Sequence, residues 1–391
     1  MNMAFFHDSK FKYEDNKYYT SGGLNNRFLK EYLDHFNEVT LITRREKIKE
    51  DDDISKYSII DLDSINFDCL DNLRIISILF GKSKKTIEKN IINHDFIIVR
   101  LPSIIGIQAC HLCNKYKKNY LVEMVGCPFD ALWNYGGIKA KIFAPIMYII
   151  NKFLIKKAPN VLYVSKKFLQ ERYPSKCNTI GVSDVKIDFP DLSILEKRIE
   201  RIEKYDKNTV YKFGLIGSLK VNYKGHDTAI KALARIKDNI KFELHFLGTN
   251  NEASIKKWSN LAKKHGIQDK LFFDGVLPGG KPVLNWIDNI DIYLIPSLTE
   301  GLPRALVEAM SRASVCIGVK AGGIPELLSQ NMIVSKKDYK NMSKLIVKLL
   351  NDKKTMIDEA KNNFNKSKNY TENRLTQQRY NFLENIILDI K

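Results

Sequence analysis

The chain has 391 residues, of which 44% are hydrophobic and 28% are charged, and this composition excludes a fibrous or disordered protein. Because this length exceeds a single ordinary core, we expect two domains of about 200 residues each. The formal net charge of +18 favours an anionic partner, and we expect a membrane surface or a phosphorylated small molecule rather than nucleic acid. Much of the charge is lysine scattered along the chain, so a compositional bias is the alternative explanation.

The six cysteines form no paired framework: Cys69, Cys110, Cys113, Cys127, Cys177 and Cys316. No N-terminal segment has the pattern of a signal peptide, and we expect a reducing, cytosolic compartment. Cys110 and Cys113 have the spacing of a metal-binding pair, but no second pair follows, so we expect buried or half-buried thiols. The longest apolar run, residues 142–150, is much shorter than the ~20 residues of a membrane-spanning helix.

The first half of the chain alternates short apolar runs with amphipathic segments. Residues 2–7 predict a strand, residues 8–23 a polar loop that ends in Gly22 and Gly23, and residues 24–36 a helix. Further strands are expected at 39–43, 94–103, 119–126 and 160–165, and further helices at 104–118 and 166–173. The run 96–99 is apolar at every position, as in parallel strands covered by helices on both faces.

The alternation weakens in the turn-rich residues 174–193 and the charged residues 195–208. It restarts at 210–219, with strands expected at 242–248, 270–275, 290–297 and 314–320 and helices at 226–237, 252–266, 283–289 and 304–312. We therefore expect an α/β protein with two Rossmann-like, doubly wound domains, residues 1–184 and 185–371, that face a central cleft. The last helix, residues 372–391, is expected to pack back on the first domain. Ligands of such sheets bind at the carboxyl ends of the strands.

Two loops have the features of phosphate-binding turns. The paired glycines Gly22 and Gly23 precede a helix, where backbone N–H groups can approach a phosphate, although a plain tight turn has the same pattern. In the second half, Gly217-Ser218 follows a strand and Lys224-Gly225 opens a helix. A lysine next to the positive end of a helix is unfavourable unless an anion lies between them, and the alternative is a solvated loop lysine.

The segment "PSLTEGLPRALVEAM" places two glutamates around the start of a helix. Glu300 follows a strand at the helix N-terminus, and Pro303 suits the first helical turn. Glu308 lies about one and a half turns inside and shares a face with Arg304. Each glutamate has a purely structural alternative, since Glu308 could pair with Arg304 and Glu300 could accept hydrogen bonds from first-turn N–H groups.

Three segments of the second half occur together: "NYKGHD" with Lys224, "EGLPRALVEA" with Glu300 and Glu308, and "KAGGIPELL" with Gly322, Gly323 and Glu326. This combination resembles the retaining glycosyltransferases of family 4, which have the GT-B fold. Their signature is E-x7-E between a strand and its helix, followed by a Gly-Gly-x-Pro-Glu turn. The resemblance extends over essentially the whole chain, because "SGGL" near the start and the domain change near residue 185 also fit.

The resemblance implies roles for the E-x7-E segment. Glu300 would hydrogen-bond hydroxyls of the donor sugar and, with Lys224, would be a catalytic residue. Backbone groups of Gly301, Leu302 and Pro303 would line the sugar and the diphosphate. Glu308 would accept hydrogen bonds from the ribose of the nucleotide.

The resemblance also implies partners for the rest of the donor. Lys224 would neutralise the diphosphate, Gly23 would approach it from the other domain, and Val276 would border the base. The family commonly has an arginine where this chain has Ser218, and we expect Lys220 to replace that cation.

Many family members have a histidine near the reacting carbon, and the comparable stretch "VEMVGCPFDALW" has none. The polar candidates on the acceptor side are therefore Arg100, Glu123 and Asp130, with structural or solvated polar groups as the alternative. No cluster in the sequence has the spacing of a metal site, and we expect no metal and no cofactor beyond the donor, with a uridine nucleotide favoured over guanosine. Cations and N–H groups at the phosphates suit a leaving diphosphate, and retention without a carboxylate pair follows from the resemblance.

Residues 136–160 combine an apolar stretch with Lys139, Lys141, Lys152, Lys156 and Lys157. They suit either an amphipathic segment on a membrane surface or a packed helix with lysines at its ends. The expected function is transfer of a sugar to a glycan, lipid-linked, in bacterial surface polysaccharide biosynthesis, in the cytoplasm and peripherally on the membrane. The alternatives are an epimerase or phosphorylase of the same fold and a non-catalytic basic binding protein.

Overall fold

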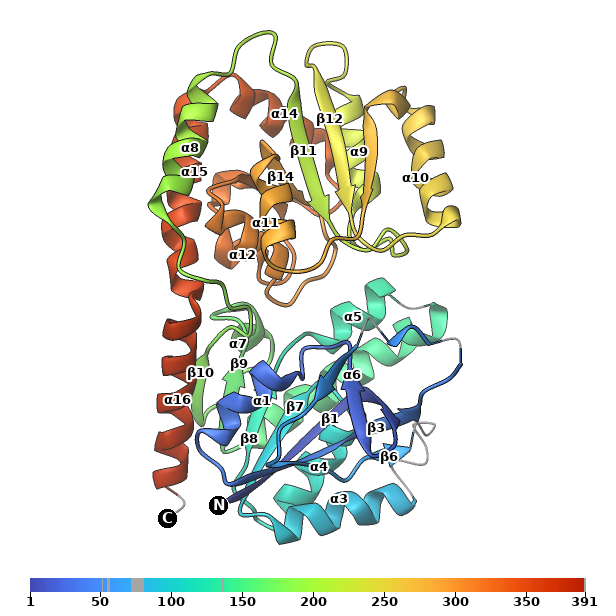
Figure 1. The fold of residues 1–391 in the computed structure, drawn as a ribbon, viewed down its shortest axis with the longest axis vertical. Helices are drawn as coiled ribbons and strands as arrows, with labels where there is room; N and C mark the ends of the chain where they lie inside the picture. Colours follow the sequence, from blue (N-terminus) through green and yellow to red (C-terminus); the bar gives the residue numbers. More distant parts are fainter. Residues whose placement is uncertain (51, 55–56, 72–80, 136, 390–391) are drawn as a thin grey trace. The chain divides into compact units, whose positions relative to one another are not determined.

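The computed structural model describes residues 1–389 except 51, 55–56, 72–80 and 136 (Figure 1). The chain divides into two compact units, the first with Met1–Phe129, Phe143–Val182 and Thr376–Lys391, and the second with Asp130–Ile142 and Ser183–Leu375. The sequence predicts these changes after residues 184 and 371, and it places 130–142 in the first domain. The structure instead places 130–142 in the second unit. The prediction assigned elements to domains in chain order, and no pattern in the sequence marks a short segment that belongs to the other unit. Residues 390–391 of the predicted last helix lie outside the described part.

The first unit contains a sheet with the order β10-β9-β8-β7-β1-β2-β4, and β3 pairs with β1, β5 and β6. The pairs from β3 through β1, β7, β8 and β9 to β10 are parallel, as expected for a doubly wound sheet. The strands are β1 (Asn2–Glu14), β2 (Lys17–Thr20), β3 (Glu38–Lys47), β4 (Ser58–Ile60), β5 (Ile65–Phe67), β6 (Leu70–Asp71), β7 (Phe96–Leu101), β8 (Leu121–Met124), β9 (Asn160–Tyr163) and β10 (Asn178–Gly181).

The predicted polar loop 8–23 is wrong over most of its length. Strand β1 continues to Glu14, and β2 pairs with it antiparallel, so that Tyr13 lies opposite Tyr18. The turn between them is Asp15-Asn16, with φ of 47° and 61°. Asp and Asn tolerate this left-handed conformation, which two-residue hairpin turns require. The open glycine loop therefore follows β2 rather than β1.

The helices of the first unit and of the segment 130–142 are α1 (Asn26–Leu33), α3 (Lys82–Asn93), α4 (Ile104–Lys115), α5 (Pro128–Tyr135), α6 (Ile138–Lys157) and α7 (Phe168–Arg172). The last helix, α16 (Glu372–Leu388), joins this unit from Thr376 onward. Its apolar residues Phe382, Leu383, Ile386 and Ile387 belong to the same buried cluster as Phe5. Helix α16 is therefore part of the core of the first unit.

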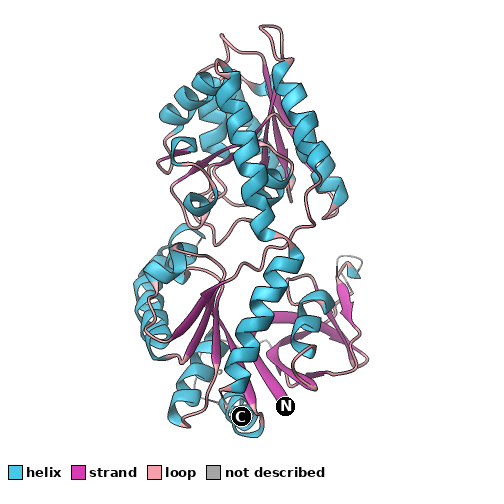
Figure 2. Ribbon diagram, turned by 90° about the vertical axis from the view of Figure 1, so that its left-hand side faces the viewer, coloured by secondary structure: helices cyan, strands magenta, loops and turns pink. Residues whose placement is uncertain are grey.

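The second unit has an all-parallel sheet in the order β13-β12-β11-β14-β15-β16, with helices on both sides (Figure 2). This is the 3-2-1-4-5-6 order of dinucleotide-binding folds. Its strands are β11 (Tyr211–Ile216), β12 (Phe242–Leu247), β13 (Leu271–Gly275), β14 (Ile292–Ile295), β15 (Val315–Val319) and β16 (Ile333–Val334). Its helices are α8 (Leu192–Glu203), α9 (His226–Ala234), α10 (Glu252–Lys264), α11 (Lys281–Asp288), α12 (Arg304–Ser311), α13 (Ile324–Leu327), α14 (Tyr339–Leu350) and α15 (Lys353–Ser367).

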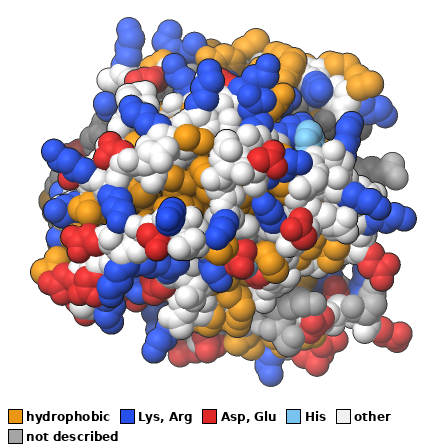
Figure 3. Space-filling view, turned by 90° about the horizontal axis from the view of Figure 1, so that it is seen from above, with side chains coloured by type: hydrophobic (Ala, Val, Ile, Leu, Met, Phe, Trp, Pro, Cys, Tyr) orange, Lys and Arg blue, Asp and Glu red, His pale blue; other side chains and the backbone are white. Residues whose placement is uncertain are grey.

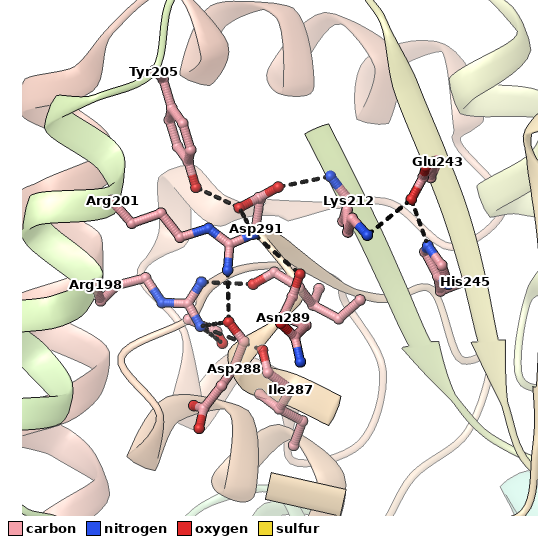
Figure 4. Close-up of polar contacts among 12 residues, drawn as sticks. Arg198, Arg201, Tyr205, Lys212, Glu243, His245, Ile287, Asp288, Asn289 and Asp291 are labelled. Atoms are coloured by element: carbon pink, nitrogen blue, oxygen red, sulfur yellow. Dashed lines mark hydrogen bonds and ion pairs between the residues drawn. The ribbon is translucent and has the colours of Figure 1, made fainter. Parts of the chain in front are cut away.

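The charged stretch 195–208 forms most of α8 and the residues that follow it, and it anchors that helix in the second unit (Figure 4). The buried Arg198 guanidinium donates to the carbonyls of Ile287 and Ile290 at the end of α11. Arg201 pairs with Asp291 at 2.6 Å. Carbonyls at a helix C-terminus have no partner within the helix, and here Arg198 satisfies those of Ile287 and Ile290 and Arg201 that of Asp288. The stretch that marks the domain change in the sequence is thus a structural anchor.

None of the helices in the described ranges is both long and apolar enough to cross a membrane.

Candidate functional site

The sheet of the second unit changes direction at β11. From β11 the chain proceeds outward to β12 and β13, and then returns to place β14 on the other side of β11. At such a switch point the loops after the two central strands diverge, and ligands bind in the crevice that they leave. The loop after β11 contains Lys224, and the loop after β14 contains Glu300. The two residues on which the sequence argument depends therefore meet at this point.

Lys224 and Glu300 form an ion pair across the switch point. The Lys224 Nζ donates to Glu300 Oε1 at 2.7 Å, and both side chains are largely shielded from solvent, at 23% and 12% exposure. Helix α12 has no side-chain cap hydrogen bond. The structural alternative, in which Glu300 caps the first turn of α12, is therefore wrong.

The Lys224 loop is held by close backbone packing. Gly225 has φ +79°, and a Cβ there would lie 2.2 Å from the carbonyl oxygen of Pro296 at the end of β14. A Cβ at Gly217 would lie 2.9 Å from Cγ of Lys224, so the lysine stem crosses the Gly217 backbone. The Leu298 N–H donates to the Tyr223 carbonyl at 2.7 Å. These contacts fix the lysine next to the strand end that precedes Glu300.

The glycines of "KAGGIPELL" hold the backbone of the Glu300 loop. Gly322 has φ +52°, and a Cβ there would lie 1.9 Å from the Glu300 carbonyl oxygen. The Gly323 N–H donates to the Gly301 carbonyl at 2.8 Å. No side chain fits between these two backbone segments. The role of the two glycines is therefore to position the backbone of Glu300 and Gly301.

Glu308 lies inside α12 and is half-buried. Burial raises the pKa of its carboxyl, and the Arg304 charge opposes this rise. Across the described residues, no ion pair or hydrogen bond engages its carboxylate, and Arg304 is exposed. The exposed Glu308–Arg304 pair of the structural alternative is therefore wrong. A shielded carboxylate without a partner has full capacity to accept hydrogen bonds from a ligand.

The remaining donor-side candidates lie on the same edge of the sheet. The Ser218 hydroxyl accepts from the Thr249 hydroxyl at 2.7 Å, and the Lys220 side chain is exposed. Leu302 and Pro303 are buried at the start of α12, whereas Val276, in the loop after β13, is 64% exposed. Their roles toward a donor stay predictions.

Tyr293 is a buried polar side chain on β14, the strand that precedes Glu300, and the sequence argument did not single it out. It is 1% exposed. Burial raises its pKa well above the ordinary value, and the charges of Glu300 and Glu308 add to this rise. The phenol therefore lies near both glutamates as a neutral group. Its only signal in the sequence is a polar atom within the apolar run of β14, which is also a common core pattern.

The acceptor-side candidates are placed in different surroundings. The Glu123 carboxylate on β8 is 1% exposed and accepts from Tyr32 and from Arg379 of α16, each at 2.6 Å. Arg100 on β7 reaches Glu123 at 3.5 Å. Asp130 is buried on α5, in the segment that belongs to the second unit. Glu123 and Arg100 thus share a buried ion-pair network in the first unit.

Gly23 lies in an exposed loop of the first unit. A Cβ there would have no neighbour within 4 Å, and its φ lies outside the left-handed region. No feature of the loop itself therefore requires glycine, and its backbone is accessible to a ligand. Its approach to a diphosphate stays a prediction.

Two cavities of the second unit differ in their relation to the ion pair. One of about 540 Å³ is lined by Asn222 and Leu298, from the two site loops, and by four lysines: Lys231, Lys257, Lys264 and Lys337. The other, of about 960 Å³, is lined by Tyr211, the first residue of β11, and by Lys241, which directly precedes β12. It therefore lies at the amino ends of these strands, away from Lys224 and Glu300.

The expected burial of Cys110 and Cys113 is confirmed, and both thiols are free. Burial raises the pKa of Cys113 to about 12. Within the described ranges, no group of three His, Cys, Asp or Glu side chains has the arrangement of a metal site.

The comparisons with known proteins agree with this geometry. The family model described as Glycosyl transferases group 1 matches residues 197–369. Protein CapJ of Staphylococcus aureus is 33% identical over 355 residues, 88% of this chain and 85% of that protein.

Two relatives match over shorter stretches. The putative colanic acid biosynthesis glycosyltransferase WcaL of Escherichia coli K12 is 30% identical over 27% of each chain. The N,N'-diacetylbacillosaminyl-diphospho-undecaprenol alpha-1,3-N-acetylgalactosaminyltransferase of Campylobacter jejuni is 26% identical over 28% of this chain and 30% of that one.

Solved structures share the fold across nearly the whole chain. Sucrose-phosphate synthase of Thermosynechococcus elongatus has a TM-score of 0.69 at 13% identity and covers 99% of both chains. HepE of Anabaena, solved in complex with UDP, has a TM-score of 0.68 at 14% identity and covers 98% of this chain and 100% of that one. The expected fold class is confirmed. The chain belongs to the group 1 glycosyltransferases and is a transferase with the GT-B fold of two Rossmann-like domains.

Proposed function

We propose that this glycosyltransferase moves a sugar, with retention of anomeric configuration, from a nucleotide-diphosphate sugar to a glycan on a lipid carrier. The observation that carries the proposal is the Lys224–Glu300 pair at the switch point of the second unit, with the unpartnered Glu308 carboxylate on the adjoining helix. A cation for a diphosphate and acceptors for sugar and ribose hydroxyls are the groups that such a donor requires.

The donor is a uridine nucleotide in this proposal. Lys224 neutralises the diphosphate, Glu300 accepts a hydrogen bond from the donor sugar, and Glu308 accepts from the ribose. HepE, whose fold this chain shares, binds UDP in its crystal structure, and this supports uridine over guanosine. Backbone groups of Gly301, Leu302 and Pro303 line the donor, and Gly23, Ser218, Lys220 and Val276 complete its surroundings.

The reaction breaks the bond between the anomeric carbon and the leaving diphosphate oxygen, and forms a bond from that carbon to an acceptor hydroxyl oxygen. The acceptor proton passes to the leaving phosphate oxygen on the same face of the sugar, which gives retention. Negative charge develops on the diphosphate as the bond breaks, and the Lys224 ammonium is the cation that stabilises it. The reaction proceeds without a metal ion in this proposal, because Lys224 and backbone N–H groups supply the positive charge.

The acceptor is a growing bacterial surface polysaccharide, such as capsule or O-antigen. WcaL is named for colanic acid biosynthesis, and the Campylobacter jejuni relative is named for transfer to a sugar on diphospho-undecaprenol. Both names support a glycan acceptor, and the second supports a lipid-linked one. The enzyme then works at the cytoplasmic face of the membrane, where Arg100, Glu123 and Asp130 are the acceptor-side candidates.

A panel of sugar nucleotides tests the donor assignment. We expect UDP-sugars to raise the midpoint of thermal unfolding more than GDP-sugars, because a ligand that binds the folded state stabilises it by mass action. We also expect slow donor hydrolysis without acceptor, lowered by Glu300→Gln and Lys224→Ala. Stabilisation by no donor would favour a non-catalytic binding protein, and an isomerised sugar nucleotide formed without acceptor would favour an epimerase.

A further inference from the structure

We propose that the exposed face of α6 is a membrane-docking surface that inserts shallowly into a bilayer with anionic lipids. Six large apolar side chains of this helix, which runs beside α5 (Figure 1), are between 47% and 80% exposed: Ile138, Ile142, Phe143, Ile146, Ile149 and Phe153. We call them the α6 stripe. Single exposed apolar residues are ordinary, but a contiguous exposed set marks an interaction surface.

The α6 stripe has a regular helical spacing. At about 100° per residue, Ile138, Ile142, Ile146, Ile149 and Phe153 fall within about 80° of one another around the helix, and Phe143 borders them. The opposite side of α6 is packed into the core, through Ala144, Asn151, Leu154 and Ile155. One side of α6 is therefore packed within the first unit. The other side presents a continuous, exposed apolar row about 22 Å long.

The charges of α6 favour a lipid surface as the occupant. The helix contains no acidic residue and five lysines: Lys139, Lys141, Lys152, Lys156 and Lys157. Those at positions 141 and 152 flank one border of the α6 stripe, those at 139 and 157 lie between its main row and Phe143, and Lys156 continues the row at the C-terminal end of the helix. A helix with an apolar row between lysines is typical of segments that lie in the headgroup region, where each lysine attracts anionic lipid.

Aromatic rings support the same orientation. The Lys157 Nζ lies 4.3 Å from the Phe153 ring, and Lys141 Nζ lies 5.9 Å from the ring of Trp133 on α5. Trp133 is 46% exposed, so it extends the apolar surface beyond α6. Lysine stems along aromatic rings keep their charged ends at the border of an apolar patch, and tryptophan is favoured at the membrane interface.

The basic residues elsewhere have a different distribution. On the face drawn in Figure 3, Lys and Arg side chains are spread over the surface with Asp and Glu side chains among them. The net charge of +18 is therefore not gathered into one patch on that face. The α6 surface differs because its lysines border an exposed apolar row and no carboxylate of the helix neutralises them.

The test is sedimentation of the full chain with vesicles of phosphatidylcholine alone or with one third phosphatidylglycerol. We expect binding to the anionic vesicles only, weakened by salt. Ile142→Ser with Ile149→Ser removes two exposed side chains and should weaken binding at least about ten-fold. Lys152→Gln with Lys156→Gln should weaken it about 20- to 30-fold at low salt.

Matched control variants remove the same kinds of side chain at positions outside α6. Phe189→Ser with Leu192→Ser deletes exposed apolar side chains of the second unit, and Lys354→Gln with Lys361→Gln deletes exposed lysines of α15. Both controls should bind like the unchanged protein. Equal binding by the Ile142/Ile149 variant, or no binding by the unchanged protein, would overturn the proposal.

A second copy of the chain is the rival occupant of the α6 stripe. A dimer without lipid that Ile142→Ser with Ile149→Ser dissociates would overturn membrane docking. Donor hydrolysis is measured in parallel without lipid, and we expect the α6 variants to keep it. Hydrolysis without any vesicle binding by the unchanged protein would contradict this inference alone, whereas vesicle binding without hydrolysis by the unchanged protein would contradict the proposed function alone.

Discussion

Lys224 and Glu300 are engaged with one another in the structure. The pair is 2.7 Å long and largely shielded, so each charge relies on the other for its solvation. In the proposed reaction the Lys224 ammonium also donates to the diphosphate, while its hydrogen bond to Glu300 holds it in place. Glu300 then has two tasks, to position the lysine and to accept from the sugar. Glu308 has no such partner within the described residues, and its proposed task is confined to the nucleotide.

The first prediction separates the two glutamates. Glu300→Gln should lower kcat about 10²-fold with a small change in KM, because it perturbs both the sugar contact and the lysine that meets the developing charge. Glu308→Gln should raise the Kd for the nucleotide and leave kcat within a few-fold. Steady-state kinetics with a saturating acceptor, together with calorimetric titration of UDP, measure both. The same effect of the two variants on kcat would contradict the assignment.

The second prediction concerns pH and Glu308. Because burial raises the pKa of this carboxyl, it takes up a proton at a higher pH than an ordinary glutamate. Its contribution to folding is present below the ordinary pKa of 4.5 and is lost as pH rises through the raised value. Nucleotide binding has the opposite sign, since the ribose hydroxyls need an ionised acceptor. The affinity for UDP should therefore fall as pH is lowered through the raised pKa.

Glu308→Gln is the control for this pH dependence, because the diphosphate also titrates. The difference between the two proteins isolates Glu308, and it should shrink to near zero at low pH. Parallel affinity curves at all pH values would show that the charge of Glu308 is not used.

At the scale of elements, the sheet order of the second unit decides where the site lies. Lys224 and Glu300 are 76 positions apart in sequence, and they meet because β11 and β14 are adjacent parallel strands. The glycines after β15 then fix the loop after β14, since β15 is the next strand in the sheet. Three consecutive strand ends of one sheet therefore build the ion pair and its support.

The third prediction tests that support with Gly322→Ala. The added Cβ would lie 1.9 Å from the Glu300 carbonyl oxygen at a φ of +52°, so the Glu300 loop must move. We expect a loss of about 2 kcal/mol or more in the free energy of unfolding, and a fall in kcat like that of Glu300→Gln. Chemical denaturation and kinetics measure the two effects.

Gly279→Ala is the matched control, because that glycine is exposed and a Cβ there has no neighbour within 4 Å. It should change neither stability nor turnover appreciably. Retention of full activity by Gly322→Ala would mean that the backbone of Glu300 does not need this support.

The elements themselves could be predicted to different degrees. In the second unit β14 and β15 are continuous apolar runs, and β11 and β12 are apolar runs interrupted by single polar residues, so the strand positions and the α/β alternation were accessible from the sequence pattern. The second half of β1 was not, because it alternates charged residues with aromatic ones, a pattern that we assigned to a loop. The signal that was present is Asp15-Asn16, a pair suited to a two-residue hairpin turn.

At the scale of the whole molecule, one helix joins elements far apart in sequence. Helix α16 ends the chain, yet its Arg379 donates to Glu123, 256 positions earlier, and its apolar residues enter the core around β1. The sequence predicted that this helix packs on the first domain, but no local pattern indicates an ion pair at such separation. In the same network Arg100 of β7 pairs with Glu123 of β8, and Glu123 takes its second cation from the far end of the chain.

The last prediction is that Arg379→Met destabilises the first unit by about 3–5 kcal/mol, because it leaves the Glu123 carboxylate buried without its closest cation. Arg374→Met on the same helix removes an exposed arginine and should change stability little.

A protein of two units can unfold in more than one transition, so thermal unfolding is followed with and without UDP. The transition that UDP raises reports the second unit, and Arg379→Met should lower the other. Adding Glu123→Gln to Arg379→Met should recover part of the loss, since it removes a buried charge that has lost its closest cation and keeps only Arg100 at 3.5 Å. If the double variant were as unstable as the sum of the two single variants, Arg379 would stabilise the unit through packing rather than through its charge.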